Sequence, residues 1–203
     1  MRSISLSPRM KLFQQLRMFF RVNIPVEIFT PNAQMSVAMA RRAAAQCKHV
    51  EVDTEHLLVG ILWLKECAAF SLLEAAGIPK KALFEALDKS IVPGSSELLF
   101  SSLQYSKAVK KVLAFSSMEA DRVGSEHVGT DHFLLGILRY GQGGAFRVMR
   151  DAGLKLDALE VLARGAEEAK RKAEQGKTSK PTPPSDKPAA AESNPPPSGT
   201  AVV

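Results

Sequence analysis

The chain repeats itself at a fixed spacing of 76 residues, and this repeat limits the folds that it can adopt. Residues 52–78 align without a gap with residues 128–154 and are identical at 11 of 27 positions. Two unrelated segments of that length would share about two identities at average residue usage. The shared positions include Thr54, His56, Gly60, Phe70 and Gly77, which return as Thr130, His132, Gly136, Phe146 and Gly153. The chain is therefore a tandem duplication, and both copies should fold alike.

Each copy has the pattern of four helices. Apolar residues recur at helical spacing, and no segment alternates with period two for long enough to predict a strand. The expected N-caps are hydroxyl residues before each first and second helix, and the expected C-caps are glycines after each third helix: Thr30, Ser106, Thr54, Thr130, Gly77 and Gly153. The predicted fold class is all-α, with tandem duplicated four-helix repeats, about eight helices in total, related by pseudo-two-fold symmetry.

Composition predicts one folded domain between two extensions. The domain is expected at 27–175, with repeat one at about 29–92 and repeat two at about 105–168. Residues 176–203 hold seven of the 12 prolines and no Leu, Ile, Met or aromatic residue. Such a tail cannot bury enough apolar surface to offset its chain entropy, so we expect it to be disordered.

Residues 1–26 form a basic leader with an amphipathic pattern. The leader contains five basic residues and no acid. On a helix, one side would carry its apolar residues, Leu12, Phe13, Leu16, Phe19 and Phe20, and Gln14 would lie among the basic residues on the other. This pattern is compatible with a poorly ordered extension, with an organelle transit peptide and with a surface-seeking amphipathic helix. The sequence leaves these three interpretations open.

The net charge of +6 does not predict nucleic-acid binding. The leader carries five basic residues and the tail three lysines against two acids, which leaves 19 basic and 19 acidic residues in the domain. A basic footprint on the folded part is excluded, and with it nucleic acid as an expected partner. No apolar run approaches the roughly 18 residues of a membrane span, so no transmembrane segment is expected.

No group of residues predicts catalysis, a cofactor or a metal. Residues 176–178, Gly-Lys-Thr, resemble the end of a phosphate-binding loop, but Arg171 stands where that motif needs a glycine. The four histidines lack an HExxH pattern and a paired cysteine. His56 and His132 are expected to bond the backbone of the neighbouring repeat near a helix cap. We therefore expect no enzyme activity, no catalytic residue, no cofactor and no metal ligand.

One family pattern occurs twice in the chain. It is carried by Phe29-Thr30-Pro-Asn-Ala33, Thr54-Glu55-His56-Leu-Leu-Val-Gly60, Tyr105-Ser106 and Thr130-Asp131-His132-Phe-Leu-Leu-Gly136. These segments resemble the double repeat of the Clp N-terminal (Clp R) domain over about residues 28–168. The resemblance implies an all-helical module of the kind that stands in front of AAA+ unfoldases such as ClpA, ClpB and ClpC and receives their substrates and adaptors. No AAA+ module follows the repeats, so the sequence is more similar to stand-alone members such as the plastid Clp accessory subunits.

The resemblance also implies a ligand site in each repeat. In the ClpC branch, a hydroxyl at the start of the first helix and the acid after the Thr of the second helix bind phosphoarginine. The matching residues are Thr30 with Glu55, and Ser106 with Asp131. A helix N-terminus offers free N–H donors to a phosphate, and a carboxylate can receive a guanidinium. The alternative is that all four residues only cap helices, and the shorter Asp131 and the neighbouring Lys107 make the second site the weaker match.

The predicted function is therefore a non-enzymatic protein-binding module that acts as adaptor, accessory subunit or substrate-recognition factor. Its expected partners are a Clp-type AAA+ ATPase or the Clp protease core, together with substrate polypeptides. The alternatives are a free-standing peptide-binding protein unrelated to proteolysis and a truncated Clp ATPase subunit. Cys47 and Cys67 have no spacing that suggests a disulfide or a metal knuckle, which is typical of a reducing compartment. The expected location is cytoplasmic, or a plastid or other organelle if the leader is a transit peptide.

Overall fold

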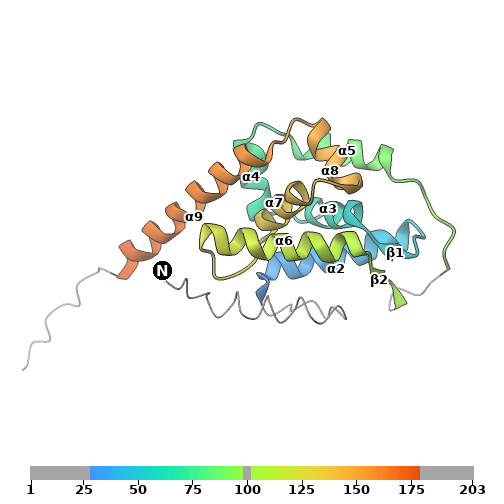
Figure 1. Ribbon diagram of the computed structural model, residues 1–203, viewed down its shortest axis with the longest axis horizontal. Coiled ribbons are helices and arrows are strands. Elements are labelled where there is room, and N and C mark those ends of the chain that lie inside the picture. Colours follow the sequence, from blue (N-terminus) through green and yellow to red (C-terminus); the bar gives the residue numbers. More distant parts are fainter. Residues whose placement is uncertain (1–27, 98–101, 179–203) are drawn as a thin grey trace, which may run out of the picture.

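The computed structural model describes residues 28–97 and 102–178, which form eight helices and two very short strands (Figure 1). Repeat one comprises α2 (Pro31–Gln46), α3 (Thr54–Leu62), α4 (Ala68–Ala75) and α5 (Lys80–Ser90). Repeat two comprises α6 (Lys107–Val123), α7 (Thr130–Tyr140), α8 (Gly143–Asp151) and α9 (Leu156–Thr178). The all-α class and the duplicated four-helix repeats are confirmed. The basic leader and residues 179–203 of the proline-rich tail lie outside the described residues, whereas residues 176–178, which were expected in the tail, belong to α9.

The hydrophobic core is shared between the repeats. Within each repeat, the first helix packs on the second, so that α2 contacts α3 and α6 contacts α7. Other close contacts cross between the repeats: α3 packs against α8 of the other repeat, and α4 against α7. Figure 1 shows α3 and α7 at the centre of the molecule, and these two helices supply most of the largest fully buried side chains. Neither repeat therefore has a complete core of its own.

Two backbone pairings between the repeats show the pseudo-two-fold symmetry. The strands β1 (Glu51–Val52) and β2 (Gln104–Tyr105) are parallel, with Val52 opposite Tyr105. An isolated parallel bridge joins Phe29 to Val128, which are the equivalents of Tyr105 and Val52 at the spacing of 76. These strands were not expected, because two residues are too few to give a period-two pattern.

The first helix of each repeat is capped as expected. The Thr30 hydroxyl accepts a hydrogen bond from the N–H of Ala33 (3.2 Å), and the Ser106 hydroxyl accepts one from the N–H of Val109 (3.1 Å). These bonds satisfy N–H groups of the first helical turn that have no partner within the helix. The two hydroxyl residues therefore have a structural task whatever else they do.

The caps of the second helices differ from the expectation. The N-caps are Asp53 and Gly129, so the prediction that Thr54 and Thr130 cap these helices was wrong. The N–H of Asp53 donates to Nδ1 of His56 (2.9 Å), and the N–H of Gly129 donates to Nδ1 of His132 (2.9 Å). Each histidine thus binds the N-cap of its own repeat, and not the neighbouring repeat as expected; at Asp53 this completes a capping box, whereas Gly129 has no side chain to form the other half.

Thr130 caps a helix of the other repeat. Its hydroxyl accepts the N–H of Ala69 in the first turn of α4 (3.1 Å), where the N-cap residue Cys67 forms no side-chain cap bond. The two ends of this bond are 61 residues apart in sequence. Repeat two therefore completes a helix terminus of repeat one.

Glycines allow the close contact between the first and second helices. A Cβ atom added at Gly60 would meet the Ser36 carbonyl oxygen and lie 2.8 Å from the Ala40 nitrogen. At the equivalent Gly136, a Cβ would meet the Ser116 hydroxyl and lie 2.7 Å from the Val112 carbonyl oxygen. Most of these neighbours are backbone atoms, which cannot rotate away as a flexible side chain would. The helix pairs α2–α3 and α6–α7 therefore require glycine at both positions.

We expect Gly60→Ala to lower the free energy of unfolding by about 1 to 3 kcal/mol, because the added methyl forces α2 and α3 apart. Gly165→Ala is the matched control, because Gly165 in α9 has no atom within 4 Å of an added Cβ. The control should raise stability by about 0.5 to 1 kcal/mol, the usual gain of alanine over glycine in a helix. Urea unfolding of both variants checks this prediction, and two shifts of equal sign would contradict it.

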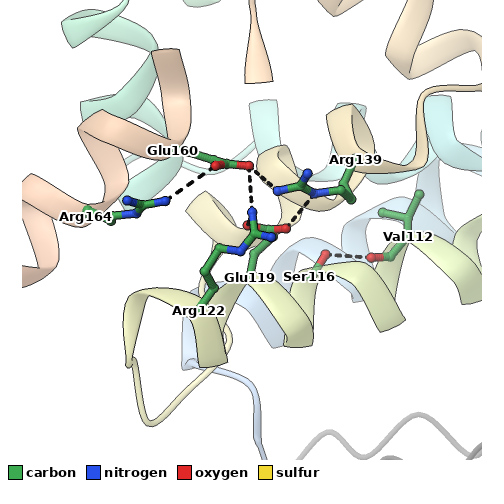
Figure 2. A network of polar contacts seen from close by, with 7 residues as sticks. All are labelled: Val112, Ser116, Glu119, Arg122, Arg139, Glu160 and Arg164. Carbon is green, nitrogen blue, oxygen red and sulfur yellow. Dashed lines mark hydrogen bonds and ion pairs between the residues drawn. The ribbon is translucent and has the colours of Figure 1, made fainter. Parts of the chain in front are cut away.

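An ionic network ties α6, α7 and α9 together in repeat two (Figure 2). Arg139 donates to Glu119 (2.8 Å) and also contacts Glu160, and this bond to Glu119 is the main cause that raises the pKa of the Arg139 guanidinium. Arg122 reaches Glu160 at 3.1 Å, and Arg164 reaches it at 3.7 Å. Glu119 is buried, and Arg139 and Arg122 supply the opposite charges that lie beside its carboxylate.

Candidate functional site

Glu55 faces a groove between the two repeats. It lies in the first turn of α3, and the groove has a volume of about 440 Å³ between α5 of repeat one and α8 of repeat two. Small residues form much of the wall, and charged ones surround the opening; these are Ala82, Ala86, Gly144 and Ala152, and Glu55, Arg147 and Asp151. The groove thus offers one cation and two anions around a narrow apolar wall.

The Glu55 carboxylate is oriented but not neutralised. Its Oε2 accepts a hydrogen bond from the Thr54 hydroxyl (3.1 Å), and a Cβ added at Gly144 would collide with its carboxyl group. Gly144 therefore lets α8 approach the carboxylate closely. The side chain is half-buried, and among the described residues it forms no ion pair within 4.0 Å. A carboxylate at this place can receive a cationic group from a ligand.

Asp131, the equivalent residue in repeat two, has a different environment. It is 6% exposed, and its Oδ1 lies 3.3 Å from Nδ1 of His132. A Cβ added at the N-cap Gly129 would collide with the same carboxylate oxygen. The shorter side chain therefore lies back on the N-terminus of its own helix, in the space that an N-cap side chain would occupy. Asp131 is buried beside the N-terminus of α7, whereas Glu55 is open to the groove.

The two hydroxyl residues lie beside the second helix of the other repeat. The N–H of Thr30 donates to the carbonyl of Val128 (3.0 Å), just before α7, and the N–H of Ser106 donates to the carbonyl of Val52 (2.9 Å), just before α3. The Ser106 hydroxyl also donates to Oδ1 of Asp53 (3.0 Å). The structure thus brings Ser106 to the start of the helix that carries Glu55. Likewise, it brings Thr30 to the start of the helix that carries Asp131.

Sequence reasoning did not find Arg147, Asp151 or Asp53. Arg147 and Asp151 line the Glu55 groove from α8. Their spacing of one helical turn did not predict a site, because the groove forms only when the two repeats pack together. Asp53 could have been found, since an N-cap acid three residues before a hydrogen-bonding side chain is a known start of a helix.

The histidines form a hydrogen-bonded chain and not a metal site. Because Nδ1 of His56 accepts the Asp53 N–H, its proton is on Nε2, which lies 2.8 Å from Nδ1 of His49. His49 in turn donates from Nε2 to the carbonyl of Val92 (2.7 Å). Within residues 28–97 and 102–178 there is no group of three His, Cys, Asp or Glu side chains that could hold a metal ion. In the same residues, no helix is both long and apolar enough to cross a membrane.

Comparison with known proteins decides the family. The sequence pattern described as the Clp repeat (R) N-terminal domain matches residues 28–152, which is more than half of the chain. The chain belongs to the Clp R family. The matched residues include all of repeat one and the part of repeat two up to the end of α8. They contain both N-cap hydroxyls, Glu55 and Asp131.

The relatives of this Clp R chain are much longer proteins, and the chain matches only a part of each. It is 32% identical to the chaperone protein ClpB of Oceanobacillus iheyensis over 156 residues, which is 74% of this chain and 19% of that relative. It is 33% identical to the negative regulator of genetic competence ClpC/MecB of Bacillus subtilis over 129 residues, 64% of this chain and 16% of that relative. The chain thus spans less than a fifth of the length of either.

Solved Clp N-domains share the fold. A ClpV N-domain in complex with a VipB peptide superposes with a TM-score of 0.57 at 14% identity, covering 69% of this chain and 88% of that one. At such low identity the likeness shows the fold alone. It agrees with the two helical repeats and places no ligand in this chain.

Proposed function

We propose that this Clp R chain is a protein-recognition module, without catalytic activity of its own, that serves a Clp-type AAA+ unfoldase or protease. It would act as adaptor, accessory subunit or substrate-recognition factor, with its partners and substrates bound by the folded unit 27–175. A cytoplasmic location is part of the proposal. The observation that carries it is the half-buried Glu55 carboxylate, which lines an inter-repeat groove and forms no ion pair with any residue that the structure describes.

The chemistry of the groove supports recognition of a polypeptide. Glu55 can receive a guanidinium in a charge-assisted pair, while Arg147 from α8 lines the same groove and can contact a phosphate. Such a pair of opposite charges suits an arginine or phosphoarginine side chain, and the small residues between them leave room for its aliphatic part. We assign the primary site to Glu55; Ser106 lies at the start of the same helix, whereas Thr30 and Asp131 lie together at the start of α7.

The relatives support a Clp partner. The curated relatives are a ClpB chaperone and a ClpC protein, and a solved relative of the same fold is a ClpV N-domain that holds a VipB peptide. A free-standing peptide binder unrelated to proteolysis would need the same groove but no Clp subunit. An affinity pull-down with the full chain as bait separates the two proposals. Recovery of Clp ATPase or protease subunits above a bait-free control supports the first, and their absence favours the second.

Glu55→Gln is expected to weaken an arginine- or phosphoarginine-bearing peptide by roughly tenfold or more. The change removes a charge-assisted contact worth about 1.5 to 3 kcal/mol but keeps the shape of the side chain. If Glu55 only complements the helix dipole, the variant loses a few tenths of a kcal/mol of stability and binds as the parent does. Calorimetric titration with the peptide measures the difference.

Asp131→Asn is the matched control for the same titration. Because Asp131 is buried against His132, we expect this variant to change peptide binding much less than Glu55→Gln does. A peptide that carries lysine in place of arginine tests whether the planar guanidinium is needed. If the unaltered chain fails to bind any of these peptides, the Glu55 site is refuted, while the Clp partnership still depends on the pull-down.

A further inference from the structure

Repeat one carries a second groove that shares no lining residue with the Glu55 groove. It has a volume of about 420 Å³ and lies where the C-terminal ends of α2 and α3 meet α5. Two large aromatic side chains on its wall are partly exposed to water, Trp63 at 37% and Phe84 at 39%. Leu87 and Val59 form its buried floor. These two side chains offer apolar area that an apolar occupant of the groove would remove from water.

The same place in repeat two is closed by charges. At the spacing of 76, the groove residues Ala43, Trp63, Phe84 and Asp88 correspond to Glu119, Arg139, Glu160 and Arg164. Figure 2 shows that these four charged side chains of repeat two pair with one another across α6, α7 and α9. Repeat one has the same helical frame without these ion pairs, so its apolar wall is left open.

The groove has one charged residue among its lining side chains, Asp88. Burial and the nearby Asp88 together raise the pKa of the Cys47 thiol, which also lines the groove. A matching occupant therefore needs a stripe of large apolar side chains flanked by basic ones and free of acids.

We propose that leader residues 11–21 occupy this groove as an amphipathic helix. This segment supplies the required stripe, Leu12, Phe13, Leu16, Phe19 and Phe20, and its charged residues are Lys11, Arg17 and Arg21. The whole leader contains no acid that would repel Asp88. Burial of the apolar side chains holds the helix in the groove. Attraction between its basic residues and Asp88 favours an orientation that brings them near this carboxylate.

The tether is long enough for this contact. Ile28 packs against the core just before α2, and the groove begins at Ala43 near the other end of that helix. Along α2, the distance from Pro31 to Ala43 is about 18 Å at the helical rise. The six residues 22–27 span about 20 Å when extended. A tether of this length gives an effective concentration in the millimolar range, so a weak intrinsic affinity suffices.

Trp63 is the single tryptophan of the chain, and its fluorescence reports on the groove directly. In the full chain we expect Trp63 to be shielded from acrylamide. The double substitution Phe13→Ser and Leu16→Ser should shift its emission to the red and raise its quenching by acrylamide, because the leader no longer covers the indole. Gln14→Ser, on the polar side of the leader, is the matched control and should change neither. Circular dichroism of each variant verifies that the helical domain is still folded.

Identical emission and quenching in the double variant and the parent chain would overturn the proposal. An emission that depends on protein concentration would also overturn it, because a second copy would then be the occupant. Cross-linking provides an independent measurement: a Leu16→Cys variant treated with a short bismaleimide should join position 16 to Cys47 within one chain. A link to Cys67 in place of Cys47, or no link, counts against leader docking.

Discussion

Replacing Leu134 by alanine is expected to lower the free energy of unfolding by roughly 2 to 5 kcal/mol. Leu134 lies in α7 and is 0% exposed at the centre of the shared core. The loss combines the transfer free energy of the removed atoms with the cavity that remains, because close-packed neighbours relax only in part. Leu58, its equivalent in α3, is also 0% exposed, so Leu58→Ala should cost a similar amount.

Val161→Ala is the control for this experiment. Val161 lies on α9 and is 69% exposed, so its truncation should change stability by no more than about 0.5 kcal/mol. Guanidinium unfolding followed by circular dichroism measures all three variants. A cost under about 1 kcal/mol at both leucines would mean that α3 and α7 do not form the core.

Acidification is expected to destabilise the fold by about 3 kcal/mol through His56. The pKa of His56 is lowered to about 4, mainly by burial and also by the neighbouring His49, while Asp53 opposes both. An unfolded histidine has a pKa of about 6.5, so the unfolded chain takes up this proton first. The stabilisation is fully present above about pH 6.5 and is lost as the pH falls from there toward 4, by about 1.4 kcal/mol per pKa unit.

His132 adds to the same pH dependence. Burial lowers the pKa of its imidazole in the folded state, although Asp131 and Glu167 oppose this effect. His56→Gln should flatten the dependence, since the glutamine amide oxygen can still accept the Asp53 N–H without titrating. His127→Gln is the control, because His127 is exposed. Unfolding free energies at several values between pH 7.5 and 4.5 give the slopes, and an unchanged slope in His56→Gln would contradict this assignment.

The fold could be predicted from the sequence because its information is local and repeated. Hydroxyl caps such as Thr30 and Ser106 and the glycines after the third helices act within one helical turn, so their spacing is visible in the chain. The caps at Asp53 and Gly129 were missed for a physical reason. Histidine replaces the usual Glu or Gln of a capping box, and Gly129 has no side chain from which a cap could be predicted.

The candidate site could be predicted only in part, because its geometry depends on how the repeats exchange contacts. The sequence identified Glu55 and Asp131 as equivalent, but a single methylene separates a carboxylate open to the groove from one buried against His132. Arg147 joins Glu55 only through the packing of α8 on α3, which no pattern within one repeat encodes. The pairing of Ser106 with Asp53 likewise depends on contacts over 53 residues.

The cap that Thr130 gives to α4 sets the order in which the chain can fold during synthesis. Ala69 leaves the ribosome 61 residues before its hydrogen-bond partner. At roughly 5 to 20 residues per second, the apolar faces of α3 and α4 wait about 3 to 12 seconds for α7 and α8. During that interval the first repeat is an incompletely packed nascent chain, and contacts of such long range form slowly. The core of the first repeat can therefore be completed only after the second repeat has been synthesised.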